Sequence, residues 1–400
     1  MKPFRDLIGF EEAKDMIMER AKPLARTERV PLFDALGRVL AEAVHSPIDV
    51  PGFTRAAMDG YAVRAEDTFG AARMSPRILG LTGKIPVGKM PGLSVGKGTC
   101  AQIATGAPLP KGADAVVPVE ETDDADGSIR IFRPAHPGAY VSAPNSDVAK
   151  GDKVLSEGTT LDPPHIGAAA ALGMNELKVY AKPSVAVFPT GDEISGLGEP
   201  LREGAVYDIN SYTLAALMKA SGAEVEIFDI VPDTAEGLKG CLKEARGFDC
   251  ALFSGGSSVG ERDMLAGVLS EIGNVRFHGI ALKPGKPTLF GNVRGTLVFG
   301  LPGYPASCLT NAYVLVRPAV RAMAHLPQAQ RVEEAVLAER ILSTIGRHQL
   351  YTVRAENGVA RPAFKESSAI TSMSNANGWI EIPQNTEFLE KGTKVSVYFF

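Results

Sequence analysis

Three segments of the chain combine an apolar run with a glycine-rich turn that carries polar side chains. They read AVFPTGDE at 186–193, ALFSGGSSVGERD at 251–263 and LVFGLPGYPAS at 297–307. Glycines such as Gly255 and Gly256, here followed by Ser257, let backbone N–H groups approach a ligand, and the helix that follows attracts anions. The pattern predicts loops that bind a phosphate-bearing molecule, although tight turns alone would need the same glycines.

Carboxylates accompany these loops. Glu193 follows the first loop, Asp263 ends the second, and Asp233 follows another predicted strand in VPDT. Several carboxylates beside a phosphate would repel it unless a cation lies between them, and Mg²⁺ is the usual cation. The alternative is that each acid caps a helix or lies in its first turn, which applies most directly to Asp263.

A fourth segment supplies positive charge. ALKPGKPTLF at 281–290 places Lys283 and Lys286 three residues apart, and Pro284 and Pro287 restrict the backbone around them. Two ammonium groups held in this way would suit an oxyanion. A solvated basic turn is the alternative.

Regular alternation of strands and helices predicts how these segments are positioned. From 183 to 325 the pattern predicts a parallel sheet with helices on both faces, so the loops would share the carboxyl edge. One of its helices covers 210–223, with Asn210 or Ser211 as cap and Gly222 as stop.

The remaining segments have other sequence patterns. Apolar spacing predicts helices at 10–27, 31–42 and within 162–180, whereas 45–150 contains short β-type runs separated by Gly and Pro. The tail from 327 predicts a small β-barrel or sandwich. Within the β region, Asp59 lies in a Met-Asp-Gly-Tyr segment that has an ordinary turn composition.

Composition limits the classes of function. The 400 residues suggest several domains, and the net charge of -4 gives no reason to expect nucleic acid or an acidic membrane as partner. We expect a cytoplasmic protein, because no apolar run is long enough to span a bilayer and acids interrupt the start. The four cysteines are scattered and are expected to be buried, reduced thiols.

Six motifs together resemble those of a known family. VPGFTRAAMDGYAVR, TGAPLPKGADAVV, TGDE, SGGSSVGERD, KPGKP and LPGYPAS occur in the order found in molybdopterin molybdenumtransferases, the MoeA proteins and gephyrin E domains. The resemblance implies a multidomain α/β plus β fold. Its parts would be a discontinuous helical domain (1–50 and 145–180), an inserted β domain (51–144), a doubly wound α/β domain of molybdopterin-binding type (181–326) and a C-terminal β-barrel (327–400).

The resemblance also implies an activity. Adenylylated molybdopterin and molybdate would be the substrates, AMP would leave in a Mg²⁺-dependent step, and the metal would enter the dithiolene. A homodimer would place Asp59 of one subunit opposite the α/β cleft of the other. A molybdopterin adenylyltransferase and acceptor apoenzymes are the further partners that this activity implies.

The family's functional positions carry over residue by residue. Asp59, Glu193, Asp233 and Asp263 would be the catalytic acids, of which Asp59, Glu193 and Asp263 would hold Mg²⁺. The substrate-binding positions would be Thr105, Asp147, Gly255, Gly256, Ser257, Lys283, Lys286, Pro302, Pro305, Arg347 and Ser367.

The chain departs from the family pattern in places. It reads VSAPNSD up to Asp147, where arginines and Gly-Glu usually precede the Asp. It reads SGGSS where Val commonly follows the glycines, and LPGYP where Asn is usual. Thr352 stands where a further Arg is often found. Fewer arginines would weaken the hold on an anion. Two alternatives follow: a paralogue that binds a molybdopterin nucleotide or handles tungstate without efficient insertion, and a dimeric scaffold.

Overall fold

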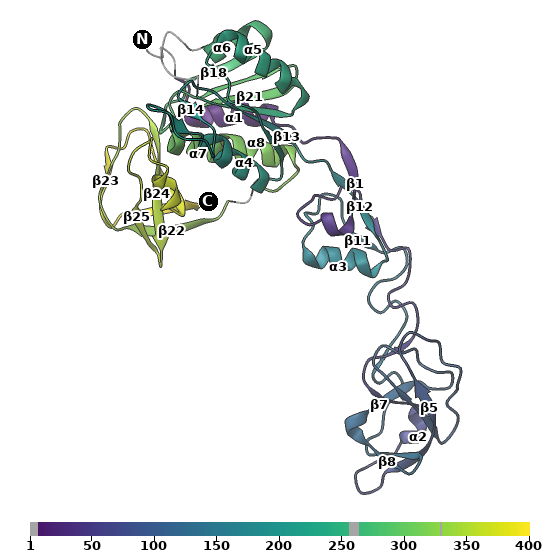
Figure 1. Ribbon diagram of the computed structural model, residues 1–400. Helices are drawn as coiled ribbons and strands as arrows, with labels where there is room; N and C mark the ends of the chain where they lie inside the picture. Colours follow the sequence, from purple (N-terminus) through teal and green to yellow (C-terminus); the bar gives the residue numbers. More distant parts are fainter. Residues whose placement is uncertain (1–6, 256–263, 329) are drawn as a thin grey trace. The chain divides into compact units, whose positions relative to one another are not determined.

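The computed structural model describes residues 7–255, 264–328 and 330–400 (Figure 1). The chain forms two compact units: unit 2 comprises Arg29–Leu36 and Leu40–Leu177, and unit 1 comprises the rest. The chain passes between them within β1 (Thr27–Pro31) and β12 (Glu176–Tyr180), and the short segment Gly37–Val39 also belongs to unit 1. No helix among the described residues is long and apolar enough to cross a membrane.

A six-stranded sheet forms the centre of unit 1. Its strands, in spatial order, are β16 (Glu224–Ile227), β13 (Ser184–Pro189), β17 (Cys250–Ser254), β21 (Thr296–Leu301), β20 (Leu289–Val293) and β18 (Asn274–His278). The first four are parallel, as predicted, but β20 runs antiparallel to β21, and β18 antiparallel to β20. The prediction of a wholly parallel sheet was therefore wrong at this edge, where the Arg294–Gly295 turn joins β20 directly to β21.

Helices cover both faces of this sheet (Figure 1). The helices of unit 1 are α1 (Phe10–Arg20), α4 (Asn210–Ala220), α5 (Ala235–Glu244), α6 (Met264–Ile272), α7 (Pro305–Asn311), α8 (Arg317–Met323) and the short α9 (Thr371–Ser374). Side chains of α5 and α6 share one core with the sheet, and those of α1, α4, α7 and α8 share the other. The layered α/β fold predicted from the alternation is confirmed.

The predicted cap of α4 was wrong. The helix begins at Asn210, and neither Asn210 nor Ser211 caps it with a side chain. The Asp208 carboxylate instead accepts the Ser211 backbone N–H over 3.0 Å. Both polar side chains are buried, because this end of the helix packs inside unit 1.

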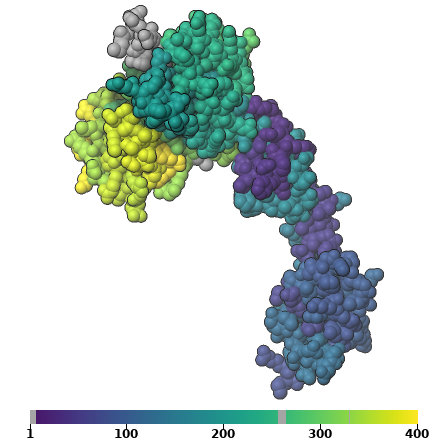
Figure 2. Space-filling view, in the orientation of Figure 1, coloured from purple at the N-terminus to yellow at the C-terminus, as the bar shows by residue number. Residues whose placement is uncertain are grey.

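The C-terminal segment forms a second six-stranded sheet. Its strands, in order, are β19 (Leu282–Lys283), β24 (His348–Glu356), β25 (Val359–Pro362), β22 (Val332–Leu337), β28 (Lys394–Phe399) and β26 (Gly378–Ile382). Because β26 also pairs with β24, five of the strands close into a barrel, which confirms one of the two predicted forms. Figure 2 shows this segment, in yellow, against the α/β part of unit 1. Trp379 of β26 joins the core beneath α1 and α8.

Unit 2 contains the predicted β region. Its six-stranded sheet has the order β7 (Ala115–Pro118), β4 (Gly60–Val63), β6 (Thr99–Ile103), β5 (Arg77–Ile85), β9 (Ser128–Ile131) and β8 (Thr122–Ala125). Two buried clusters form its core. Its helices are α2 (Ala65–Thr68) and α3 (Pro163–Ala171), of which Asp162 caps the second.

Short strand pairs complete both units. They are β2 (Val44–His45) with β11 (Lys153–Leu155), β3 (Arg55–Ala56) with β10 (Val141–Ser142), β14 (Ile194–Ser195) with β15 (Val206–Tyr207), and β23 (Ile341–Leu342) with β27 (Phe388–Leu389). The four-domain boundaries inferred from the sequence stay a prediction.

The helix predicted at 31–42 was wrong. Only Leu32–Asp34 form a 3₁₀ turn, after which Gly37 adopts a φ of 74° and ends it. Val39 and Leu40 are consecutive and both buried, which suits an extended segment rather than one face of a helix. All four cysteines are buried free thiols, as predicted.

Candidate functional site

The three glycine-bearing loops begin at the same level of the central sheet. In the parallel register, Pro189 of β13 lies opposite Ser254 of β17, and Ser254 lies opposite Leu301 of β21. The loops that follow these residues therefore start side by side at the carboxyl edge, where ligands bind in open α/β sheets.

Backbone contacts hold these loop starts together. Thr190 donates its N–H to the Ser254 carbonyl over 3.1 Å, and Gly255 donates its N–H to the Leu301 carbonyl over 3.2 Å. Gly255 has a φ of 100°, and a Cβ at this position would lie 2.3 Å from the Thr190 carbonyl oxygen. Only glycine is compatible with both constraints. Gly256, Ser257 and Asp263 lie outside the described residues.

The acids of unit 1 lie near this edge in different surroundings. Glu193 is exposed, and its carboxylate folds back over Gly191, where a Cβ would lie 2.7 Å from Oε2. Asp233 is partly buried and immediately precedes Thr234, the residue that caps α5. The Gly191 N–H donates to the Val231 carbonyl over 3.4 Å, which brings the two loops together.

The donor set suits Mg²⁺ only in part. In the described portion of the chain, no three His, Cys, Asp or Glu side chains are grouped to hold a metal ion. Mg²⁺ commonly binds one or two protein carboxylates and takes its other ligands from water and substrate phosphates. Exposed carboxylates such as Glu193 and Asp59 have the right oxygen chemistry for that mode of binding.

The lysine loop is anchored at its Lys283 end. Lys283 lies in β19, opposite Gln349 of β24, and its Nζ donates to Thr344 Oγ1 over 2.7 Å. The loop thus contacts the C-terminal barrel as well as the α/β layers. Lys286 is partly buried.

A buried asparagine fixes the middle of this loop. Asn311 of α7, which is fully buried, donates its Nδ2 group to the Gly285 carbonyl over 3.0 Å and to Thr288 Oγ1 over 2.5 Å. Thr288 also donates its hydroxyl to the Gly285 carbonyl over 2.8 Å. Gly285 has a φ of 102° and lies so close that a Cβ would be 2.2 Å from Asn311 Nδ2. This packing leaves the backbone between the two lysines little freedom.

A second asparagine holds the third loop. Asn210 donates Nδ2 to the Gly303 carbonyl over 2.9 Å. Pro302 is buried before this glycine, and Pro305 is the first residue of α7. The backbone N–H of Ala306 donates to the Ser367 carbonyl over 3.1 Å, which places Ser367 at the start of α7.

Arg347 joins this edge from the barrel. Its neighbour His348 donates its backbone N–H to the Ala281 carbonyl over 2.9 Å, just before the lysine loop. The Arg347 side chain is partly exposed and makes no hydrogen bond or ion pair with the residues that the structure describes. Its guanidinium therefore has donors available for an anion.

Three predicted positions lie in unit 2. Thr105 donates both its backbone N–H and its hydroxyl to Asp59 Oδ1, over 2.7 and 3.0 Å. These two bonds hold the pKa of the exposed Asp59 carboxyl below its ordinary value. Asp147 is also exposed, and its backbone N–H donates to the Val50 carbonyl over 3.0 Å.

The structure thus forms two separate groups of predicted residues. Asp59 and Thr105 meet in unit 2, while the described positions of unit 1 lie on loops at the carboxyl edge and the adjoining barrel strand. Sequence reasoning missed Asn210, Asn311 and Thr344 as partners of these loops. Asn210 had been interpreted as a helix cap, and no local pattern marked the other two, because their contacts join segments distant in the chain.

Comparisons with known proteins cover nearly the whole chain. Residues 8–173 match the MoeA N-terminal region (domain I and II), residues 186–322 match a "Probable molybdopterin binding domain", and residues 334–400 match the MoeA C-terminal region (domain IV). Molybdopterin molybdenumtransferase 2 of Mycobacterium tuberculosis is 35% identical over 96% of both chains, and molybdopterin molybdenumtransferase of Haemophilus influenzae is 32% identical over 98% of both.

A solved structure agrees with these matches. The molybdopterin biosynthesis MoeA protein from Pyrococcus horikosii shares 40% identity, with a TM-score of 0.84 over 98% of this chain and 99% of that one. Sequence and fold therefore agree along the full length, and the chain belongs to the MoeA family.

Proposed function

We propose that this chain is a molybdopterin molybdenumtransferase that inserts molybdate into adenylylated molybdopterin and releases AMP. Membership of the MoeA family makes it an enzyme of molybdenum cofactor biosynthesis. The observation that supports the specific reaction is the joining of the glycine-loop edge to the Lys283–Lys286 loop within unit 1. One edge thus combines a backbone turn that only glycine fits with ammonium groups suited to an oxyanion.

The residues at this edge have distinct proposed tasks. The glycine-bearing turn at Gly255 would let the pterin phosphate approach the backbone closely, because a side chain is excluded at that position. Lys283, Lys286 and Arg347 would hold molybdate, a tetrahedral dianion, by charge and hydrogen bonding. Mg²⁺, when bound, would neutralise charge on the phosphoanhydride, with Glu193, Asp263 and Asp59 as its protein ligands.

Asp59 would act from a second subunit. Its hydrogen bonds with Thr105 lower the pKa of the carboxyl further below its ordinary value and fix the orientation of Oδ1, which suits a ligand for a cation. We propose a cytoplasmic homodimer in which Asp59, Thr105 and Asp147 of one subunit complete the cleft of the other. A monomer in light scattering would rule this arrangement out.

The activity is tested by incubating the protein with adenylylated molybdopterin and Mg²⁺, with and without molybdate, and measuring AMP. Molybdate-dependent AMP release is the expected result. Loss of that release in Lys283→Gln/Lys286→Gln, with retention in Lys243→Gln, would tie it to the loop. Tight nucleotide binding without release would instead indicate the paralogue, and no binding would indicate the scaffold. A parallel arm with tungstate separates the two oxyanions.

A further inference from the structure

The opposite, amino edge of the central sheet carries a basic cavity. Strands β13, β17 and β21 start here, at Ser184, Cys250 and Thr296. A cavity of about 280 Å³ opens beside the last two strands. The side chains that give it its character are Arg20, Lys22, Arg246, Phe248, Arg294 and Met323. All belong to unit 1, at the edge opposite the glycine loops.

The charge of this cavity is strongly one-sided. Its four basic side chains, Arg20, Lys22, Arg246 and Arg294, face a single acid among the lining residues, Asp249. The chain as a whole has a net charge of -4, whereas this cavity is locally positive.

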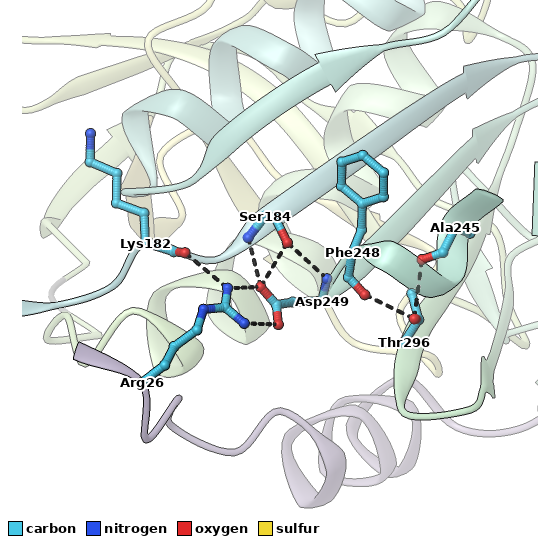
Figure 3. A network of polar contacts seen from close by, with 7 residues as sticks. All are labelled: Arg26, Lys182, Ser184, Ala245, Phe248, Asp249 and Thr296. Atoms are coloured by element: carbon cyan, nitrogen blue, oxygen red, sulfur yellow. Dashed lines mark hydrogen bonds and ion pairs between the residues drawn. The ribbon is translucent and has the colours of Figure 1, made fainter. Parts of the chain in front are cut away.

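The one acid is already neutralised. Both oxygens of Asp249 accept bonds from the Arg26 guanidinium, and Oδ2 also accepts the backbone N–H and hydroxyl of Ser184, over 2.7 and 2.9 Å (Figure 3). Burial acts to raise the pKa of the Asp249 carboxyl, but these bonds outweigh it and hold that pKa below its ordinary value. Asp249 is thus occupied by Arg26, and the four cavity cations keep their charge unopposed by it.

One of these cations is incompletely satisfied. The Nε atom of Arg246 is buried and has no hydrogen-bond partner within the described part of the chain. A buried guanidinium nitrogen without an acceptor costs free energy, so a turn of this side chain toward an acceptor in the cavity would sacrifice no hydrogen bond of Nε. Phe248 and Met323 supply an apolar wall next to this group.

We propose that this cavity binds a small anion that carries one or two phosphate groups. The guanidinium groups of Arg246 and Arg294 would bind phosphate oxygens as multi-donor forks, and Arg20 and Lys22 would add charge at the rim. The partly buried Phe248 ring would accommodate a base or another flat group, which favours a nucleotide over inorganic phosphate. This ligand would be distinct from one held at the glycine loops.

Isothermal titration calorimetry tests this proposal with two probes, AMP and inorganic pyrophosphate. Four full-length proteins are compared: the unmodified chain, Arg246→Gln/Arg294→Gln, Lys243→Gln and Lys283→Gln/Lys286→Gln. Lys243 is the matched control, because it is an exposed cation on α5 that does not line the cavity. Circular dichroism melting establishes that each variant is folded.

We expect Arg246→Gln/Arg294→Gln to weaken binding at least about tenfold, the effect of losing one or two charged hydrogen bonds. Lys243→Gln and Lys283→Gln/Lys286→Gln should bind the probe at this cavity with the affinity of the unmodified chain. Tighter binding of AMP than of pyrophosphate would indicate a nucleotide, and the reverse would indicate the phosphate groups alone. Binding that disappears only in Lys283→Gln/Lys286→Gln, or no binding of either probe, would overturn the proposal. If Arg246→Gln/Arg294→Gln does not fold, Arg294→Gln alone, at an exposed turn, replaces it.

Discussion

Replacing Gly285 by alanine tests the anchoring of the lysine loop. The new methyl group would lie 2.2 Å from Nδ2 and 2.4 Å from Oδ1 of the fully buried Asn311. The φ of 102° adds a backbone conformation that alanine rarely adopts. Asn311→Ala removes the clash, but it also removes both hydrogen bonds donated by Nδ2.

The losses of unfolding free energy in the single and double variants show whether the two residues are in steric contact. Gly285→Ala is expected to cost about 3–5 kcal/mol of unfolding free energy, the sum of backbone strain and overpacking. Asn311→Ala should cost about 2–4 kcal/mol, from two hydrogen bonds and a small cavity. In the double variant the methyl group occupies space that the amide has left. Its loss should be smaller than the sum by about 2 kcal/mol.

Urea unfolding followed by tryptophan fluorescence measures these changes. Trp379 is the single tryptophan, and it lies in the barrel whose strand β24 pairs with the lysine loop through β19. Gly240→Ala is the matched control, because Gly240 lies in α5 with open space around its Cβ position, and it should be neutral or slightly stabilising. Additive losses, or a Gly285→Ala variant as stable as the control, would refute the steric lock.

Three other changes have directions set by the structure. Thr105→Val removes a hydrogen bond to Asp59, so the pKa of that carboxyl should rise and the acid limb of AMP release should move to higher pH; Thr105→Ser should restore it. Because the pKa of Asp249 is lower in the folded than in the unfolded chain, ionised Asp249 stabilises the fold at pH values above its unfolded-state pKa. This contribution is lost as the pH falls through the folded-state pKa. Arg26→Met should therefore lower the Tm more near neutrality than in acid, which calorimetry will measure. Gly255→Ala should cost about 2–4 kcal/mol in urea unfolding, since its Cβ would lie 2.3 Å from a carbonyl oxygen.

The elements that sequence predicted best are those whose pattern is local. β13, β17 and β21 are buried along their length, and their apolar runs end at Pro, Ser or Gly residues that mark the carboxyl edge. The positions of the glycine loops followed from this, because parallel strands place their ends together. Gly255 could be identified in advance because its role depends on the backbone alone.

Long-range contacts limited the rest of the prediction. The segment 31–42 has helical apolar spacing, yet its backbone bonds join distant residues: the Leu32 N–H donates to the Asn175 carbonyl and the Leu40 N–H to the Thr159 carbonyl. Strand β18 carries Arg276 and pairs across a bulge with β20, so its sequence lacks the continuous apolar run of β17 and β21. In such segments tertiary pairing outweighs local propensity.

The asparagines at the functional edge were missed for a related reason. Asn311 lies in a helix whose sequence, PASCLTN, gives no sign of a partner on the lysine loop. Its importance depends on a glycine 26 residues earlier that approaches it closely. A contact of this kind needs the fold before it can be inferred.

Position 352 carries Thr where the family often has Arg, and the surroundings of this residue matter as well as the loss of charge. Thr352 is 2% exposed, its Oγ1 is buried without a partner among the residues described, and it lies opposite Trp379 across β24 and β26. A guanidinium enclosed there without an acid would be costly, so in the proposed site the barrel would offer an anion Arg347 rather than a pair of arginines. With fewer charges, affinity for an oxyanion depends more on how little Lys283 and Lys286 must reorganise on binding. The buried amide of Asn311 restricts that reorganisation, because it fixes the backbone between the two lysines before any ligand arrives.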